Sequence, residues 1–212
     1  MHNAAQGAVV SPTDELVLAS ANPGKIREFG QLFAPLGLRI KAQSEFGVVE
    51  VEETGLTFVE NALLKAREAS RISGLPSLAD DSGLEVDALS GKPGIYSARF
   101  AGEPKSDARN NAKLLESLEG VEGDRRSARY WCALVYLRHA DDPVPLIVQC
   151  RWDGVILEKP QGEGGFGYDP LFWLPSLGKS VAELSAEEKN RLGHRGRALQ
   201  AMLAALRETR QH

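Results

Sequence analysis

Apolar and polar positions along the chain follow strand-like and helix-like periods in turn. A short apolar run at residues 15–19 is followed by an amphipathic segment over 26–33 and a second short run over 38–42. Residues 58–72 then carry apolar side chains at helical spacing, and a buried strand is expected at 77–79. Because strand-length and helix-length patterns succeed one another, we expect an α/β fold.

The second half of the chain predicts two long strands, over 126–138 and 145–152, joined by a polar turn. The first of them is apolar in both alternating phases, which is typical of a central strand covered on both faces. Ser106 is placed to cap a helix that runs to about residue 118, and an apolar stripe over 198–206 predicts a last helix. These elements indicate one α/β domain with a mixed sheet.

Composition narrows the classes of function. The chain has 212 residues, 42% of them hydrophobic, which suits one globular domain, and its net charge of −4 disfavours nucleic acid as a partner. Cys132 and Cys150 lie far apart without a CxxC pattern, so a disulfide framework or zinc site is not expected. We find no membrane-span or signal-peptide pattern and expect a cytoplasmic protein. Residues 1–14 are expected to form a flexible tail, and residues 15–212 the functional domain.

Two adjacent carboxylates, Asp80 and Asp81, follow the strand at 77–79 and precede Ser82 and Gly83. We expect a glycine-assisted turn here. Aspartates are rarely buried unless they are paired or bound to metal, and no Lys or Arg is adjacent in sequence. An external cation such as Mg²⁺, which prefers oxygen ligands, would satisfy them. On this stretch alone a solvated turn is the stronger interpretation.

Residues 20–25, Ser-Ala-Asn-Pro-Gly-Lys, join the first strand to the first amphipathic segment. A strand, a polar turn and a helix start with a lysine form a typical anion-binding arrangement, because backbone N–H groups at a helix N-terminus favour negative charge. The stretch is not a Walker A loop. A capped strand-to-helix turn without a ligand explains the residues equally well.

An acidic patch containing Glu52 and Glu53 precedes the next helix, whose start is marked by a capping box of Thr57 and Glu60. Lys65 lies near the apolar stripe of that helix. A lysine in such a position usually extends its ammonium group to solvent, and contact with a ligand is the less common alternative.

The glycine-rich segment 162–170 surrounds one aromatic side chain, Phe166. Glycines let a backbone come close to a flat ligand, and an exposed aromatic ring can stack on a base. A mobile surface loop with Phe166 inserted into the core is the alternative, and on this segment alone it is the stronger interpretation. Near the C-terminus, His194 and Arg195 stand between two glycines and predict an exposed pair of hydrogen-bond donors. Together these features suit a Mg²⁺-nucleotide better than a smaller ligand.

The chain resembles the inosine triphosphate pyrophosphatase family. The matching motifs occur in order from about residue 16 to residue 206, at 20–25, 52–55, 57–58, 60–62, 79–84, 93–99, 164–170 and 193–196. Ala21 stands where glycine or another small or polar residue is common, and Gly193 where serine is common. Neither departure removes a charged group.

The resemblance implies an elongated α/β domain of two lobes around a long curved mixed sheet, with flanking helices and an active-site cleft between the lobes. It also implies a homodimer that hydrolyses inosine, deoxyinosine and xanthosine triphosphates to the monophosphate and pyrophosphate, with Mg²⁺ as cofactor. Such an enzyme would remove deaminated purines from the nucleotide pool before they enter DNA or RNA.

The resemblance further implies a role for each matching residue. Asp81 would be the general base and a metal contact, with Glu52 or Glu53 completing the metal site. The phosphates would be held by Ser20, Ala21, Asn22, Pro23, Gly24, Lys25, Lys65 and Ser82. The base and sugar would be held by Phe166, Gly167, Tyr168, Asp169, Lys189, His194 and Arg195.

Two other functions remain as alternatives. A nucleotide-binding sensor without turnover would be favoured by the loss of a carboxylate, but the aspartates and glutamates named above are all present. A pyrophosphatase acting on standard or modified pyrimidine nucleotides is the second alternative, and the His194–Arg195 pair weighs against it.

Overall fold

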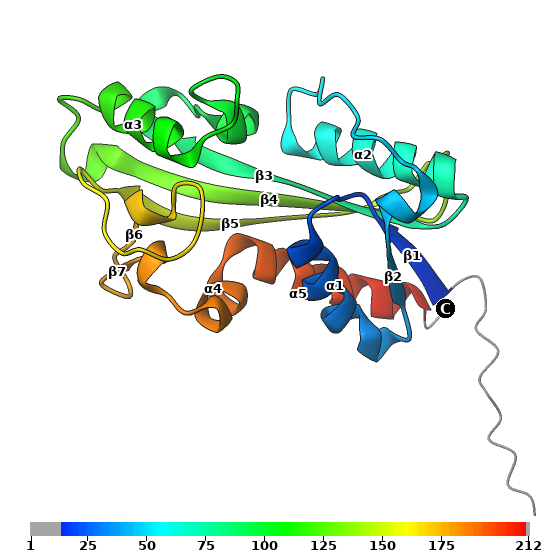
Figure 1. Ribbon diagram of the computed structural model, residues 1–212. Coiled ribbons are helices and arrows are strands. Elements are labelled where there is room, and N and C mark those ends of the chain that lie inside the picture. Colours follow the sequence, from blue (N-terminus) through cyan, green and yellow to red (C-terminus); the bar gives the residue numbers. More distant parts are fainter. Residues whose placement is uncertain (1–13, 211–212) are drawn as a thin grey trace, which may run out of the picture. The chain divides into compact units, whose positions relative to one another are not determined.

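The computed structural model describes residues 14–210 (Figure 1). Apart from Asp14, the predicted tail of residues 1–14 lies outside the described residues. The strands are β1 (Glu15–Leu18), β2 (Arg39–Ala42), β3 (Ser77–Val86), β4 (Ser127–Leu137), β5 (Leu146–Ile156), β6 (Phe172–Leu174) and β7 (Lys179–Ser180). The helices are α1 (Pro23–Phe33), α2 (Phe58–Ser73), α3 (Asp107–Ser117), α4 (Ala186–Leu192) and α5 (His194–Arg210).

The strands form a seven-stranded sheet of order β2-β1-β3-β4-β5-β6-β7. β1 pairs in parallel with β2 and β3, whereas β6 pairs antiparallel with β5 and β7. The predicted α/β fold with a mixed sheet and flanking helices is therefore confirmed. None of the helices within residues 14–210 is both long and apolar enough to cross a membrane.

The chain divides into two compact units. Of the described residues, the first unit contains 14–53, 63–79 and 135–146, and the second contains 54–62, 80–134 and 147–210. In the first unit, the apolar residues of β1 are fully buried, as are Phe29 and Phe33 of α1. These two rings stand one helical turn apart with parallel planes, so α1 presents one apolar face to its unit.

In the second unit, β3, β4 and β5 are the long strands (Figure 1). Their inward side chains, including Leu84, Tyr130 and Trp152, form one core with Phe172 of β6 and with Leu114 of α3. Strand β5 extends four residues beyond the predicted end at residue 152. Because α3 contributes directly to this core, its N-terminal end has a fixed place in the second unit.

A buried arginine secures the C-terminal end of α3. Arg126 is 5% exposed, and its guanidinium donates to the carbonyls of Leu118 at 3.0 Å, Val121 at 2.9 Å, Ile156 at 2.7 Å and Leu157 at 3.0 Å. Carbonyl groups at a helix end have no partner within the helix, so a buried donor with a forked geometry satisfies several of them at once. Arg126 thereby joins the end of α3 to the end of β5.

The predicted turn at Asp80–Gly83 is wrong, because β3 continues through these residues to Val86. Gly83 is required for close approach rather than for a turn. A Cβ atom there would lie 2.5 Å from the carbonyl oxygen of Gly94 and 2.6 Å from Ser97 Oγ. The Ser97 hydroxyl accepts from the Leu84 N–H at 2.8 Å and donates to the Gly94 carbonyl at 2.6 Å, so it joins strand and loop at this point.

Candidate active site

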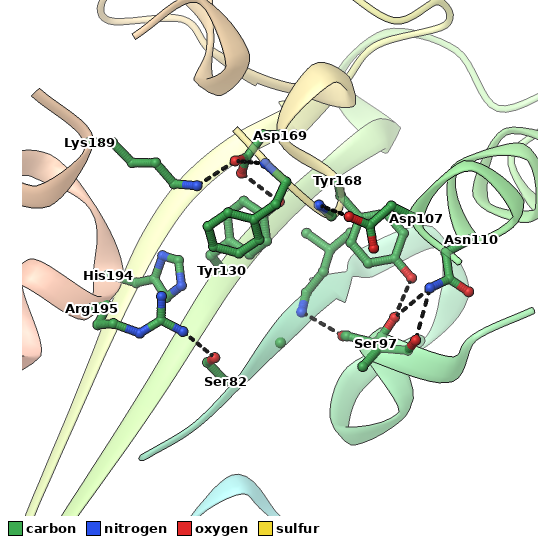
Figure 2. A pocket seen from close by; sticks show the side chains of 15 residues that line it. Ser82, Ser97, Asp107, Asn110, Tyr130, Tyr168, Asp169, Lys189, His194 and Arg195 are labelled. Atoms are coloured by element: carbon green, nitrogen blue, oxygen red, sulfur yellow. Dashed lines mark hydrogen bonds and ion pairs between the residues drawn. The ribbon is translucent and has the colours of Figure 1, made fainter. Parts of the chain in front are cut away.

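The second unit contains a pocket of about 210 Å³ (Figure 2). Its lining comes from β3, β4, the first turn of α3, the loop around Phe166, and the junction of α4 and α5. All the residues predicted to hold the base and sugar line this pocket, together with Ser82 from the predicted phosphate set. The fold brings these residues to one pocket although they are more than a hundred positions apart in the chain, and their contact with a base and sugar stays a prediction.

The predicted exposed donor pair is largely covered, with His194 buried and Arg195 half-buried. His194 is 8% exposed, and its ring stacks on Tyr130 with centroids 4.8 Å apart and an angle of 16° between the ring planes. The Arg195 side chain is 17% exposed. Figure 2 shows both side chains directed toward the pocket from the start of α5. The prediction of exposure was wrong because α5 begins at His194 and packs both residues into the unit.

The two glycines beside the pair serve helix packing rather than ligand approach. Gly193 ends α4, and a Cβ atom there would lie 2.6 Å from the Lys189 carbonyl. A Cβ atom on Gly196 would lie 1.5 Å from the Asn190 carbonyl oxygen. Only residues without a side chain fit at these two positions, so they fix the tight junction that directs His194 and Arg195 into the pocket.

Arg195 supplies the cation that Asp80 needs. Its Nε lies 3.4 Å from Asp80 Oδ2, and its Nη2 donates to Ser82 Oγ at 3.1 Å. The Asp80 side chain is 1% exposed, and a carboxylate so deeply buried needs a charged or hydrogen-bonding partner. Asp80 and Ser82 are two residues apart on β3 and share one face of the strand. The predicted external cation is therefore, for Asp80, an arginine more than a hundred positions away.

Asp81 has a different environment. It is half-buried, and successive strand residues point to opposite faces. Asn61 Nδ2 lies 3.5 Å from Asp81 Oδ2, and Asn61 Oδ1 accepts from the Gly55 N–H at 2.8 Å. Asn61 is fully buried, so it links the turn at Gly55 to Asp81. The two adjacent carboxylates thus have distinct partners and distinct burial.

The aromatic loop presents Phe166 to solvent, with 62% of the residue exposed. The exposure contradicts insertion into the core, which was the stronger interpretation of this segment alone, and agrees with the alternative of an exposed ring. Lys189 Nζ lies 3.7 Å from the ring centroid and also pairs with Asp169. Asp169 is 2% exposed and accepts from the Tyr130 hydroxyl at 3.2 Å, so the loop rests on a buried charged group.

Two buried phenols keep their protons in this pocket. Burial raises the pKa of Tyr130 well above its ordinary value, and the negative charge of Asp169 raises it further. Burial also raises the pKa of Tyr168, with a smaller contribution from Asp107. Both hydroxyls therefore remain donors at neutral pH, and that of Tyr168 donates to the Ser97 carbonyl at 2.8 Å.

The predicted phosphate segment, 20–25, belongs to the first unit and forms a capped helix start. Asn22 is the N-cap of α1, and its Oδ1 accepts from the N–H groups of Gly24 at 2.8 Å and Lys25 at 3.3 Å. Pro23 takes the first helical position, and Ser20 Oγ accepts from the Asn22 N–H at 3.2 Å. The segment therefore forms the capped strand-to-helix turn that was one of the two interpretations. Anion binding by this segment stays a prediction.

Lys65 and Glu53 form an ion pair of 2.9 Å within the first unit. The Lys65 side chain is 19% exposed, so it does not extend to solvent as the commoner alternative predicted. Glu52 is exposed. Within each unit, the described residues bring no three His, Cys, Asp or Glu side chains together as a metal site. Of the predicted metal ligands, Asp81 belongs to the second unit and both glutamates to the first.

Sequence reasoning missed several residues of the pocket lining, among them Ser97, Asp107, Asn110 and Tyr130. It also missed Asn111 of α3, which donates to the Gly167 carbonyl. The capping signal at Ser106 correctly predicted where α3 begins, and Ser106 Oγ accepts from the Arg109 N–H at 3.3 Å. It gave no indication of what the first turns of that helix contact. Tyr130 lies in a strand that is apolar in both phases, where a phenol is indistinguishable from core.

Comparison with known proteins identifies the family. The sequence model of the Ham1 family matches residues 16–205. A protein of Chromobacterium violaceum named dITP/XTP pyrophosphatase is 61% identical over 194 residues, which cover 92% of this chain and 98% of that protein. A protein of the same name from Escherichia coli (strain K12) is 56% identical over 193 residues, covering 91% and 98%. These names confirm the predicted resemblance.

Solved structures of Ham1 proteins have the same fold as this chain. The Ham1 protein of Coxiella burnetii superposes with a TM-score of 0.89 at 46% sequence identity, covering 92% of this chain and 98% of that chain. The Ham1 protein of Staphylococcus aureus gives a TM-score of 0.85 at 42% identity, covering 92% and 99%. The family match spans most of the chain, and relatives well above half identical cover it almost end to end. The chain therefore belongs to the Ham1 family.

Proposed function

We propose that this protein hydrolyses non-standard purine nucleoside triphosphates, ITP, dITP and XTP, to the nucleoside monophosphate and pyrophosphate. The observation that carries the proposal is the pocket of the second unit, where an exposed aromatic ring, a half-buried lysine paired with a buried aspartate, and a half-buried arginine converge. The dITP/XTP pyrophosphatases that resemble this chain over nearly its full length support it. Its role is to clear deaminated purines from the nucleotide pool before a polymerase uses them.

The pocket suits the base of such a substrate. The exposed ring of Phe166 offers a stacking surface, and stacking on an aromatic side chain accepts any base. Discrimination then depends on the base edge. Deaminated purines carry a 6-oxo group where adenine has a 6-amino group. A hydrogen-bond donor such as Arg195 or His194 therefore binds the 6-oxo group. The same donor is left facing the amino hydrogens of adenine, which is costly in a buried site.

We assign the phosphates to Ser82 and, in the first unit, to residues 20–25 and Lys65. Lys25 and Lys65 bring positive charge to the triphosphate. Ser82 offers a hydroxyl that the Arg195 guanidinium orients at 3.1 Å. Phosphoryl transfer needs positioning and charge neutralisation more than covalent help, so lysines and oriented hydroxyls are the groups that the reaction requires.

The carboxylates fit a divalent metal by the chemistry of their donor atoms, which are the hard oxygens that Mg²⁺ prefers. We assign the ion to Asp81 with Glu52 or Glu53, and it would neutralise charge on the phosphates when bound. Asp80 is excluded from this set by its burial against Arg195. Asp81 is half-buried, as a group that both holds a metal and accepts a proton must be. As general base, its carboxylate takes the proton of the water that attacks the α-phosphorus.

We also propose that the protein works as a homodimer in the cytoplasm. The family resemblance supports the dimer. The two cysteines support a cytoplasmic location, because Cys132 and Cys150 are free thiols, as is usual in a reducing compartment.

The proposed function is tested by incubating the protein with ITP and Mg²⁺ and measuring pyrophosphate and orthophosphate separately. We expect one pyrophosphate for each IMP formed, and a kcat/KM for ITP far above that for ATP. Discrimination of roughly 10⁴-fold is within reach of a site that hydrogen-bonds the distinguishing group. Binding without product would identify a sensor, and faster turnover of dCTP or UTP than of ITP would identify a pyrimidine pyrophosphatase. Either result refutes the proposal.

A further inference from the structure

Helix α3 holds the backbone of Gly167, the residue that follows Phe166. The N–H of Gly167 donates to Asp107 Oδ2 at 2.6 Å, and its carbonyl accepts from Asn111 Nδ2 at 2.9 Å. Figure 2 shows the Asp107 carboxylate directed at the loop. Asp107 and Asn111 are four positions apart, so they stand above one another on one face of α3. One helix face thus binds both the donor and the acceptor of a single residue in the aromatic loop.

These anchors matter because they act on the residue between the exposed Phe166 and the buried Tyr168, which fixes the loop only from the next position onward. Gly165 and Gly167 both have positive φ angles, 76° and 61°, a region that glycine enters without strain. Phe166 itself is largely exposed and cannot hold its place by burial. On the N-terminal side of the ring, the Phe166 N–H donates to Asp169 Oδ2 at 2.9 Å. The position of the ring therefore depends on backbone hydrogen bonds to either side of it and on Lys189, whose ammonium group lies over the ring.

Neither anchor is needed to hold α3 in the unit. Leu114 and Leu118 bury the helix in the core, and Arg126 secures its end. Asn110, which is 2% exposed, joins α3 to the neighbouring loop through the Ala101 N–H at 2.7 Å. Asp107, in contrast, is exposed and contributes little to packing.

Asn111 has one side-chain atom without a hydrogen-bond partner and one that binds the loop. Its Oδ1 is buried and has no hydrogen-bond partner among residues 14–210. A buried polar atom without a partner is destabilising, and an apolar side chain of similar size would avoid that penalty. The amide is therefore unfavourable for packing alone, and its contribution is the bond from Nδ2 to the Gly167 carbonyl.

We propose that Asp107 and Asn111 are positioning residues that hold Phe166 in the orientation in which it stacks on the substrate base. The proposal rests on the proposed function, because it takes the pocket to be the base site. The two residues act through the loop backbone. Their loss is expected to weaken binding of the base and to leave binding of the phosphate chain unchanged.

The test compares two ligands by calorimetry: IMP, which carries a base, and inorganic tripolyphosphate, which does not. For Asp107→Ala and for Asn111→Leu, we expect the Kd of IMP to rise about tenfold, the usual scale for losing a hydrogen bond with a charged or buried partner. The Kd of tripolyphosphate should not change. In steady state, KM for ITP should rise by a similar factor while kcat stays within about twofold.

Two further variants separate positioning from a general effect. Asp107→Asn keeps an oxygen acceptor for the Gly167 N–H and should restore most of the IMP affinity. Glu116→Ala removes an exposed carboxylate elsewhere on α3 and should change neither ligand. Thermal unfolding of each variant shows that the unit remains folded. If Asp107→Ala proves too unstable to assay, the Asn111→Leu result decides.

The proposal is overturned if IMP binding is unchanged in both main variants, or if IMP and tripolyphosphate weaken equally. If the wild-type protein hydrolyses ITP and the variants bind IMP and hydrolyse ITP equally well, only the positioning role is refuted. A wild-type protein that neither binds IMP nor hydrolyses ITP refutes the proposed function and the positioning role together.

Discussion

Removing Arg195 should affect stability and purine selection together, because the same guanidinium contacts Asp80 and faces the base pocket. Asp80 is 1% exposed, and the Arg195 side chain is 17% exposed, with 3.4 Å between Nε and Oδ2. Removing one partner of a buried ion pair costs about 3–5 kcal/mol, because the remaining charge stays buried. The long contact and partial exposure place this pair at the lower end, so Arg195→Ala should lower the free energy of unfolding by about 3 kcal/mol.

The assay is urea unfolding followed by circular dichroism at pH 7, on wild type, Arg195→Ala, Asp80→Asn and the double variant. Asp80→Asn removes the buried charge, so the double variant should be more stable than Arg195→Ala. If the change in unfolding free energy of the double variant differs from the sum of the two single changes, Arg195 and Asp80 interact in the folded protein. Strict additivity of the two single effects would refute the argument that Arg195 compensates the charge of Asp80.

The same variants test selection of the base. We expect Arg195→Ala to narrow the preference for ITP over ATP, chiefly by lowering kcat/KM for ITP, with little gain for ATP. Arg195→Lys keeps a positive charge but loses the forked donor geometry, so it should restore stability more than selectivity. If Arg195→Ala kept the full preference while remaining folded, the base edge would have to be recognised by backbone groups of the Phe166 loop.

Three further predictions follow from individual residues. Asp81→Asn should lower kcat for ITP by orders of magnitude with the unfolding midpoint nearly unchanged, and normal turnover would remove Asp81 from the mechanism. Asp142 accepts hydrogen bonds from Arg138 and Val144, and its pKa is lowered, first by the side-chain bond from Arg138. Because the folded-state pKa lies below the unfolded value, this carboxylate stabilises the fold at neutral pH and loses its contribution as pH falls below about 4. Unfolding curves of wild type and Asp142→Asn should therefore converge in acid, and a constant difference across pH would contradict this. Gly83→Ala should destabilise by about 1–3 kcal/mol through overpacking, whereas Gly30→Ala, where nothing lies within 4 Å, should be neutral or stabilising in the same urea assay.

Local sequence signals correctly predicted the features that depend on residues close together in the chain. Ser106 caps α3 as the sequence predicted, because a cap needs only a hydroxyl and an N–H three positions later. The glycines around Phe166 did not by themselves predict its exposure, because insertion into the core was the stronger interpretation of that segment alone. The order of the motifs was enough to indicate the family.

Only the tertiary structure decided which groups compensate one another. Asp80 and Asp81 look equivalent in sequence, yet one is buried against Arg195 and the other is half-buried beside Asn61. The partner of Asp80 is 115 positions away, and no local pattern carries that information. The same limit explains why Asp80–Gly83 was predicted as a turn. Aspartate and glycine disfavour strands locally, but a distant arginine and a closely packed Ser97 make the extended conformation stable. Propensity acts between neighbours in the chain, whereas burial and charge compensation depend on neighbours in space.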